Sequence, residues 1–495
     1  MRTCGILLPV SSLPSPYGIG CFSREAYEFI DQLVQAGQTY WQILPLGPTG
    51  YGDSPYQSFS AFAGNPYFID LDALADEGLL SREEYSAIDF GWDARKVDYA
   101  KLYEHRFSVL YQAFLRADLE HDEEFHHFCA SQAYWLEDYS LYMAVKRHFG
   151  ERSWDAWDED IRLRKPEALA HYRGLCAKEM QFYRFLQYEF TRQWARLKAY
   201  ANAHGIQIIG DTPIYVAFDG ADSWAQPELF QFDEDRRPAG VAGCPPDAFS
   251  ADGQLWGNPL YDWEYHEKTG YAWWISRLEH CFRLYDVVRI DHFRGFDEYY
   301  AIPYGEPTAQ NGCWKKGPGM KLFDALHAHF GDAPIIAEDL GYLTDSVMEL
   351  LAASGYPGMK VMEFAFDSRE AGDYLPYHYT RNCVAYTGTH DNQTLAAWYG
   401  ELTPEDQAFA AEYLQLAGRS TEEMVWSFIR LTLGCVADTA VVPMQDYLCL
   451  GAQARMNQPA TLGENWRWRM LRGEFTDELA DRIRKAAQTY GRCGS

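Results

Sequence analysis

The sequence predicts an α/β protein built on a (β/α)8 TIM barrel, with inserted subdomains on the C-terminal face of the strands. Two observations predict this fold: eight short apolar runs, and helical patterns between many of them. Runs that are apolar throughout are typical of strands buried on both faces, as in a parallel sheet. The runs are residues 5–10, 39–46, 206–214, 287–293, 334–341, 358–364, 383–391 and 439–446.

Helical patterns with recognisable ends separate the runs. In residues 23–36 apolar side chains recur three and four positions apart, Ser23 is a candidate N-cap, and Gly37 is a candidate stop. A similar pattern over 183–203 ends just before Gly205. Each of these helices leads into the next apolar run, as the barrel requires.

Long gaps between some runs predict inserted subdomains. About 160 residues separate the second run from the third, and about 70 separate the third from the fourth. We expect one catalytic barrel over 1–495, with a mostly helical insertion at 70–180. Residues 215–280 are rich in Gly, Pro and Asp, so we expect an irregular insertion there, with a loop at 243–261 over the barrel mouth.

The charge and the cysteines restrict the partners and the compartment. The chain has 71 acidic and 43 basic residues, which disfavours a nucleic-acid partner and an anionic membrane surface. No apolar run approaches the roughly 20 residues of a membrane span. The 11 cysteines include no CxxC pair, as in a reduced, cytoplasmic protein. Aromatic residues make up 16% of the chain, which fits either a large core or stacking surfaces for sugars.

Carboxylates occur at the C-terminal ends of five runs, where a barrel places its active site. Burying a charge in an apolar run is costly without a partner or a function, although capping of the next helix could explain one or two of them. Converging carboxylates suggest divalent metal binding or glycosidic chemistry. His292 and His390 each adjoin one of the acids, but adjacent side chains of a strand point to opposite faces, which favours glycosidic chemistry and no metal. The five are Asp211, Asp291, Glu338, Asp391 and Asp446.

Three of these runs also resemble a known family. VVRIDHFRG (287–295), IIAEDLG (335–341) and YTGTHDN (386–392) resemble the catalytic segments of the 4-alpha-glucanotransferases, also called amylomaltases or disproportionating enzymes, of the alpha-amylase clan. The resemblance covers nearly the whole chain. It extends through GILLPVSSLPSPYGIG (5–20), GYGDSPYQSFSAFAGNP (50–66), GDTPIYV (210–216), GCPPDAFSADGQLWGNPLY (243–261) and RMNQPAT (455–461).

The resemblance implies a division of labour among the carboxylates. Asp291 resembles the nucleophile that forms a glucosyl ester, Glu338 the general acid and then base, and Asp391 the carboxylate that stabilises the oxocarbenium-like transition state. Arg289 precedes Asp291 by one strand period, so both side chains face the same side and the arginine can hold the nucleophile ionised. Glu338 must begin protonated, which needs a raised pKa.

The resemblance also implies a substrate-binding set. Asp211 and His390 resemble residues that bind hydroxyls of the sugar at the cleaved bond, and Tyr56 resembles its aromatic platform. Alternatives remain open: Tyr56 could pack a turn, His390 could only support Asp391, and Glu338 could pair with Arg294. The further expected members are Asp247, Gln254, Trp256, Asn258 and Asn392.

The implied reaction is retaining transfer of an alpha-1,4-glucan segment from a malto-oligosaccharide to the 4-hydroxyl of glucose or another glucan, without a cofactor. An amylase-like hydrolase, a non-catalytic glucan-binding protein and a metal-dependent barrel hydrolase are the alternatives. Two positions depart from the family pattern: Ala460 stands where glycine is frequent, and CFS (21–23) replaces an acidic, glycine-containing turn. Both lie outside the carboxylate segments.

Overall fold

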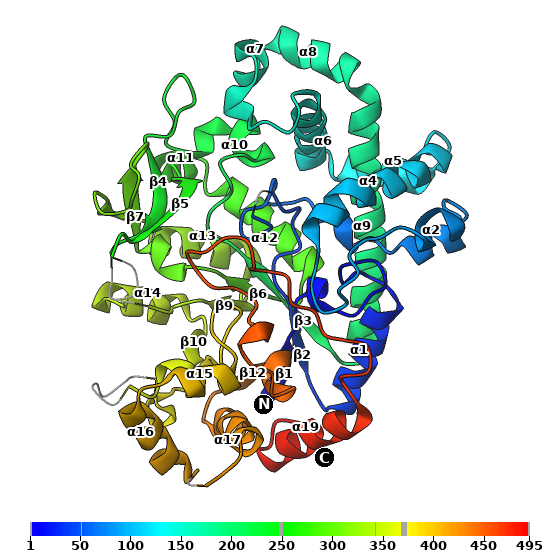
Figure 1. Cartoon of the computed structure of the whole chain (residues 1–495). Coiled ribbons are helices and arrows are strands. Elements are labelled where there is room, and N and C mark those ends of the chain that lie inside the picture. The colour runs from blue at the N-terminus through cyan, green and yellow to red at the C-terminus, as the bar shows by residue number, and fades with distance from the viewer. Residues whose placement is uncertain are drawn as a thin grey trace.

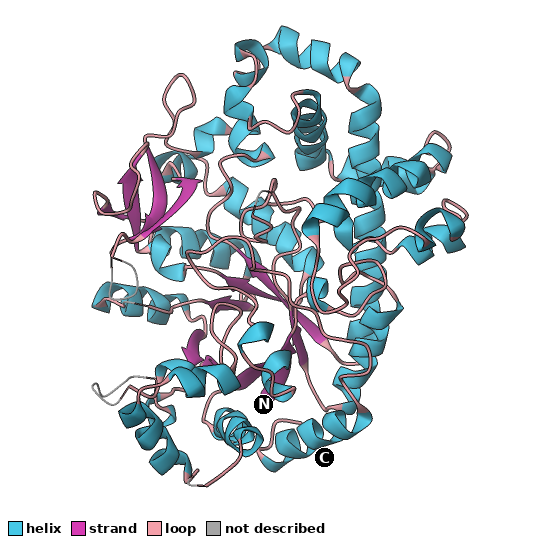
Figure 2. Ribbon diagram, viewed as in Figure 1, coloured by secondary structure: helices cyan, strands magenta, loops and turns pink. Residues whose placement is uncertain are grey.

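Eight parallel strands form the central barrel of this computed structural model, which describes residues 2–50, 52–246, 251–341, 343–367, 374–416 and 418–493. The strands follow one another around the barrel in chain order (Figures 1 and 2). The strands labelled β4, β5, β7 and β8 belong to a separate sheet. They are β1 (Thr3–Leu7), β2 (Tyr40–Gln42), β3 (Gln207–Thr212), β6 (Val287–Ile290), β9 (Ile335–Ala337), β10 (Gly358–Val361), β11 (Cys383–Tyr386) and β12 (Thr439–Pro443).

The barrel strands coincide with the apolar runs of the sequence. Seven lie wholly within a run, and β1 begins two residues before its run. Side chains from six strands fill the barrel interior, among them Leu7, Ile209 and Val384. The seam between β9 and β10 is bridged by the N–H of Ala337, which donates to the carbonyl oxygen of Pro357 at 2.9 Å. The predicted TIM barrel is therefore confirmed.

Helices between the strands surround the barrel. Ser23 occupies the N-cap position of α1, although its hydroxyl donates to Glu25 at 2.6 Å and not to the helix backbone. The C-terminal helix α19 packs against α1. The helices around the barrel and after its later strands are α1 (Arg24–Gln35), α12 (Ala272–Leu284), α13 (Met320–Phe330), α14 (Asp345–Ser354), α15 (Leu395–Glu401), α16 (Pro404–Leu414), α17 (Thr421–Gly434), α18 (Met444–Tyr447) and α19 (Asp477–Thr489).

The chain between β2 and β3 is helical. In Figure 1 these helices lie at the top and right, and the longest, α9, returns the chain to the barrel. The helix expected at 183–203 is the second part of α9, which begins earlier. The helices of this segment are α2 (Leu71–Asp76), α3 (Glu83–Ser86), α4 (Tyr99–Arg116), α5 (Glu123–Ser131), α6 (Ala133–His148), α7 (Glu159–Arg162), α8 (Pro166–Leu175) and α9 (Ala177–Ala203).

The range 215–280 differs from the irregular segment that we expected. It contains helices α10 (Ala221–Ala225) and α11 (Trp263–Lys268), most of α12, and two strands of a four-stranded antiparallel sheet. Strand β4 of this sheet pairs with β7, which lies outside the range 215–280, so the composition of the range could not reveal that pairing. The sheet stands beside the barrel at the left of Figure 2. Its strands are β4 (Gly240–Cys244), β5 (Gln254–Pro259), β7 (Glu298–Pro303) and β8 (Cys313–Lys316).

A segment without long helices, residues 451–470, links α18 to the C-terminal region and crosses in front of the barrel in Figure 1. Its far end is fastened to the first loop of the chain, because Ser12 donates to the carbonyl oxygen of Trp468 at 2.8 Å. We refer to residues 451–470 as the strap. Among the described residues, no helix is long and apolar enough to cross a membrane.

Candidate active site

The ends of β3 and β6 bring two carboxylates onto one arginine. Asp211 of β3 lies directly opposite Arg289 of β6 in the parallel register. Nη1 of Arg289 donates to both carboxylate oxygens of Asp211, at 2.7 and 2.8 Å, and to Oδ1 of Asp291 at 3.0 Å. Burial lowers the pKa of Arg289, but the two carboxylates outweigh it and raise that pKa above its usual value. The guanidinium therefore stays charged and orients both acids.

Asp211 and Asp291 differ in their access to solvent. The Asp211 side chain is fully buried, whereas the Asp291 side chain is 28% exposed. Strand β6 ends at Ile290, and His292 adopts a left-handed backbone with φ of 53°. The chain therefore turns immediately after Asp291, which leaves this carboxylate at the barrel mouth.

Glu338 follows the neighbouring strand β9 and faces the same end of the barrel. Its Oε2 accepts from the N–H of His292 at 2.7 Å, and its Oε1 accepts from the N–H of Leu340 at 2.8 Å. Burial and the negative charge of Asp291 raise the pKa of Glu338 to about 7, against the opposing charge of Arg289. Near neutral pH this carboxyl group can therefore both donate and accept a proton.

Asp391 lies beyond the end of β11, in an environment of the opposite kind. Its Oδ1 accepts from the side-chain amide of Asn457 at 2.6 Å, and its Oδ2 lies 3.4 Å from Nε2 of His390. Partial loss of water raises the pKa of Asp391, but His390 and Asn457 outweigh this effect and lower it to about 2. The side chain is 46% exposed. It therefore presents a permanent negative charge to the open cleft.

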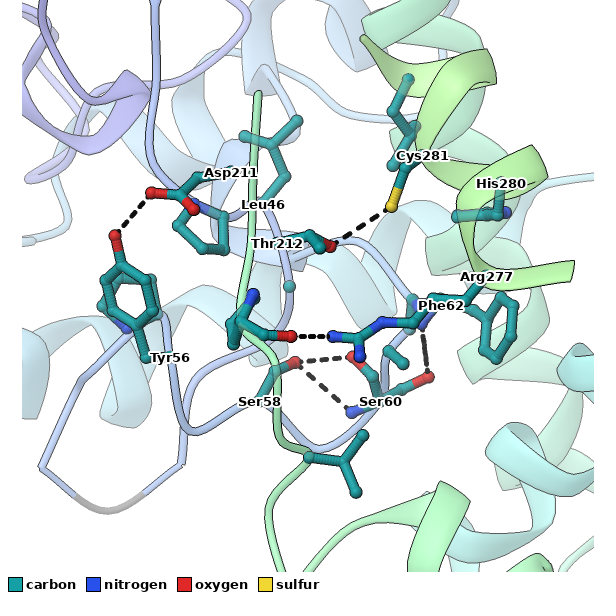
Figure 3. Close-up of a pocket in the computed structure, with 18 of the residues that line it drawn as sticks. Leu46, Tyr56, Ser58, Ser60, Phe62, Asp211, Thr212, Arg277, His280 and Cys281 are labelled. Carbon is teal, nitrogen blue, oxygen red and sulfur yellow. Dashed lines mark hydrogen bonds between the residues drawn. The ribbon is translucent and has the colours of Figure 1, made fainter. Parts of the chain in front are cut away.

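Tyr56 contacts both Asp211 and His390. Its hydroxyl donates to Oδ2 of Asp211 at 2.7 Å, and its ring stacks on His390 with centroids 5.1 Å apart. Figure 3 shows Tyr56 and Asp211 pointing toward each other beside a small cavity, with Cys281 of α12 on its other side. The tyrosine thus contacts both of the other residues expected at the sugar of the cleaved bond.

The loop expected over the barrel mouth reaches the site through Trp256. The Trp256 ring meets His292, the residue after Asp291, edge-on at 4.9 Å, and its indole N–H donates to Oε1 of Gln254 at 3.0 Å. The amide of Asn258 is buried, donating to the carbonyl oxygen of Val216 at 2.8 Å. Asn258 therefore anchors β5. Asp247 lies outside the described residues.

Other acidic or polar residues of the motifs have internal partners. Asp446 accepts from Thr387 Oγ1 at 2.7 Å and from the N–H of Leu395 at 2.8 Å. Asp446 therefore binds the first residue of α15, a helix that precedes it in the chain, and it does not cap α18, the helix that follows its own strand. Oδ1 of Asn392 accepts from the N–H and the hydroxyl of Thr389. These two contacts shape the loop after β11.

Glu338 makes no ion pair with Arg294 among the described contacts. The Arg294 guanidinium lies over the ring of Trp314, 3.9 Å from its centroid. Asp339 turns to the opposite side from Glu338, because its Oδ1 accepts from the N–H of Met359 in β10 at 2.6 Å. This orientation leaves Glu338 as the carboxylate of the pair that faces the cleft.

The strap supplies residues that sequence reasoning did not place in the site. Besides Asn457, Arg455 donates to the carbonyl oxygen of Asp391 at 2.8 Å, and the Trp466 ring lies 5.9 Å from Tyr56. The RMNQPAT motif contains both Arg455 and Asn457 and was the available signal. Arg455 lies 64 residues after Asp391 in the sequence, so the motif alone did not indicate that the two segments are in contact.

Three carboxylates with separate environments therefore surround one cleft. One is held by an arginine, one titrates near neutrality, and one remains ionised, which is the set that cleavage of a glycosidic bond through a covalent ester needs. Among the described residues, no group of three or more His, Cys, Asp or Glu side chains is arranged to hold a metal ion.

Comparisons with known proteins agree with this chemistry. A sequence profile of the family described as 4-alpha-glucanotransferase matches residues 8–474. A 4-alpha-glucanotransferase of Clostridium butyricum is 50% identical over 487 residues, covering 98% of this chain and 99% of the relative. The solved amylomaltase from Streptococcus agalactiae in complex with acarbose has a TM-score of 0.97, 43% identity and full coverage of both chains. The amylomaltase from Corynebacterium glutamicum, 20% identical, shares the fold with a TM-score of 0.79, covering 98% of this chain and 75% of that one.

Proposed function

Because the chain belongs to the 4-alpha-glucanotransferase family, we propose that its site moves alpha-1,4-glucan segments between malto-oligosaccharides by a retaining double displacement. In the first half-reaction Asp291 attacks the anomeric carbon of the donor, while Glu338 protonates the departing glycosidic oxygen. This step leaves a glucosyl ester on Asp291 and releases the reducing-end portion of the donor. In the second half-reaction Glu338 takes the proton of the acceptor 4-hydroxyl, which displaces the ester.

The observation that carries this proposal is the separation of the carboxylates by environment. Glu338 has a pKa of about 7, as an acid that becomes a base requires, while Asp391 has a pKa of about 2 and keeps its negative charge. A fixed negative charge in the cleft stabilises the positive charge that develops on the sugar ring. Arg289 keeps Asp291 oriented for attack.

Binding of the donor sugar falls to the residues around Asp211. We propose that Asp211 and His390 bind its hydroxyls and that Tyr56 supplies an aromatic face, supported by the contacts of Tyr56 with both. Asn392 acts by shaping the loop that carries His390.

Binding of the acceptor and exclusion of water fall to the loop at 243–261. Trp256 covers the side of the cleft next to His292, and Gln254 fixes the orientation of its ring. Asn258 acts by anchoring β5, and we place Asp247 among the groups that meet sugar hydroxyls. Water exclusion is what lets an acceptor sugar compete with the solvent for the glucosyl ester.

Incubation of the protein with maltotriose tests the proposal. Transfer gives glucose together with a ladder of longer malto-oligosaccharides, whereas hydrolysis gives maltose and glucose alone. A glucan-binding protein without catalysis would leave maltotriose unchanged. Persistence of the activity in excess chelator would separate this mechanism from that of a metal-dependent hydrolase.

We also infer a cytoplasmic location and a subdivided chain. All eleven cysteines are free thiols in the structure, which suits a reducing compartment. The helices within 70–180 and the mixed segment 215–280 would act as inserted subdomains on the single barrel. Residue-level protection from hydrogen exchange would test whether these segments open independently.

A further inference from the structure

Glu363 lies behind the loop of residues 387–394, which carries His390 and Asp391. It follows β10 in a single turn of 3-10 helix, Met362–Phe364, and only 7% of its surface is exposed. Its backbone N–H donates to the carbonyl oxygen of Thr387 at 3.2 Å, where the loop begins. A buried carboxyl group therefore lies beside the loop that carries Asp391.

The side chain of Glu363 packs against the loop backbone at Gly388. A Cβ atom added to Gly388 would lie 2.8 Å from Oε1 and 3.2 Å from Cδ of Glu363. Only glycine at this position allows the carboxyl group to approach so closely. Oε1 is buried and has no hydrogen-bond partner among the described residues. The group thus fills the space beneath the loop rather than pairing with a charge.

The charges around Glu363 favour its neutral form. Burial and the negative charge of Asp446 raise the pKa of Glu363 well above its usual value, and Glu401 acts in the same direction. Arg455 and the backbone N–H of Gln393 oppose this effect without outweighing it. The protonated side chain that these effects favour has nearly the same size and shape as glutamine.

Other contacts fasten the loop around its edge. Asp446 binds Thr387 at the start and the N–H of Leu395 just past the end. From the strap, Arg455 binds the carbonyl oxygen of Asp391, and Asn457 binds its carboxylate. The packing of Glu363 at Gly388 supports the loop from beneath, in the stretch between these contacts.

We propose that Glu363 is a positioning residue for the transfer reaction, which supports the loop 387–394 from beneath and so holds Asp391 and His390 in the cleft. The inference rests on the proposed role of Asp391. Asp391 acts chiefly on the charge of the transition state, so displacement of the loop lowers kcat more than it weakens substrate binding. A shift of about 1 Å can cost about 100-fold in rate.

Three substitutions test the inference in transfer assays with maltotriose. Glu363→Ala, which empties the space under the loop, should lower kcat by about 10- to 100-fold with little change in KM. Glu363→Gln, which keeps the size and shape of the side chain against Gly388, should restore most of kcat. Glu405→Gln is the matched control: it makes the related acid-to-amide change at an exposed position in the first turn of α16, and it should leave both parameters unchanged.

A folded Glu363→Ala variant with wild-type kcat, or a Glu363→Gln variant as impaired as Glu363→Ala, would overturn the inference. If Glu363→Ala does not fold, Glu363→Leu replaces it. A lower kcat in Leu than in Gln supports the role, and equal values refute it. Absence of transfer by the wild-type protein would instead count against the proposed function, so the two failures are distinguishable.

Discussion

Nη1 of Arg289 lies 3.0 Å from Oδ1 of Asp291, and the same nitrogen is shared with both oxygens of the buried Asp211. One guanidinium therefore links a carboxylate that is buried in this structure to one that is partly exposed. This link fixes the position of Asp291 through the barrel itself and not through a mobile loop. This position suits the attack on the sugar that we propose for Asp291.

Replacement of Asp291 should abolish turnover. We expect Asp291→Asn to lower kcat on the order of 10⁴-fold or more, because the amide cannot form the glucosyl ester. In the wild type, a 5-fluoro glucosyl fluoride should label Asp291, as judged by peptide mapping. Labelling of Asp391 or Asp211 would show that the roles are assigned wrongly.

The pKa of Glu338 predicts the alkaline limb of the activity profile. Because burial and Asp291 raise this pKa to about 7, the acid form predominates below that pH and is lost as the pH rises through it. We expect kcat/KM for maltotriose to fall above about pH 7. A flat profile to pH 9 would contradict the assignment of Glu338 as the acid.

Glu338→Gln should distinguish donors by their leaving groups. We expect a loss of about 10²- to 10⁴-fold with maltotriose, whose glycosidic oxygen needs a proton to depart. A maltotriosyl fluoride donor needs far less acid assistance, so its ester should form and accumulate. Equal losses with both donors, measured by release of fluoride and of glucose, would be inconsistent with acid catalysis by this residue.

Trp256→Ala should raise the ratio of hydrolysis to transfer. The ring lies against His292 at the edge of the cleft, so its removal admits water to the glucosyl ester even if total turnover falls. Free glucose and reducing ends produced from maltotriose give the ratio. Trp92→Ala is the control, because Trp92 is 89% exposed. An unchanged ratio in folded Trp256→Ala would remove this residue from water exclusion.

Ala460→Gly should stabilise the strap. Ala460 has a φ of 61°, a left-handed backbone conformation that is strained for a residue with a Cβ atom but not for glycine. We expect the free energy of unfolding to rise by about 0.5 kcal/mol, because the relief of strain slightly exceeds the added entropy of the unfolded chain. Gly463→Ala, at φ of 103°, should lower it. Denaturant unfolding of both variants measures the difference, and a loss of stability in Ala460→Gly would contradict this account.

The sequence by itself determined the barrel and several of the residues at its mouth. All eight strands coincide with apolar runs, because burial on both faces leaves few alternatives to an uninterrupted hydrophobic segment. Asp211, Asp291 and Glu338 could be placed at the mouth because parallel strands end on the same face. The pairing of Arg289 with Asp291 followed from the two-residue period of a strand.

Only the tertiary structure decided which polar groups serve the cleft and which serve the fold. Asp446 and Asn258 occur in equally suggestive motifs, yet their partners are internal. Asn457 and Glu363 reach the Asp391 loop from segments 66 and 28 residues away from Asp391, and β4 pairs with β7, which begins 54 residues after β4 ends. Contacts over such separations depend on how the barrel brings distant segments together, and no local pattern of residues encodes them.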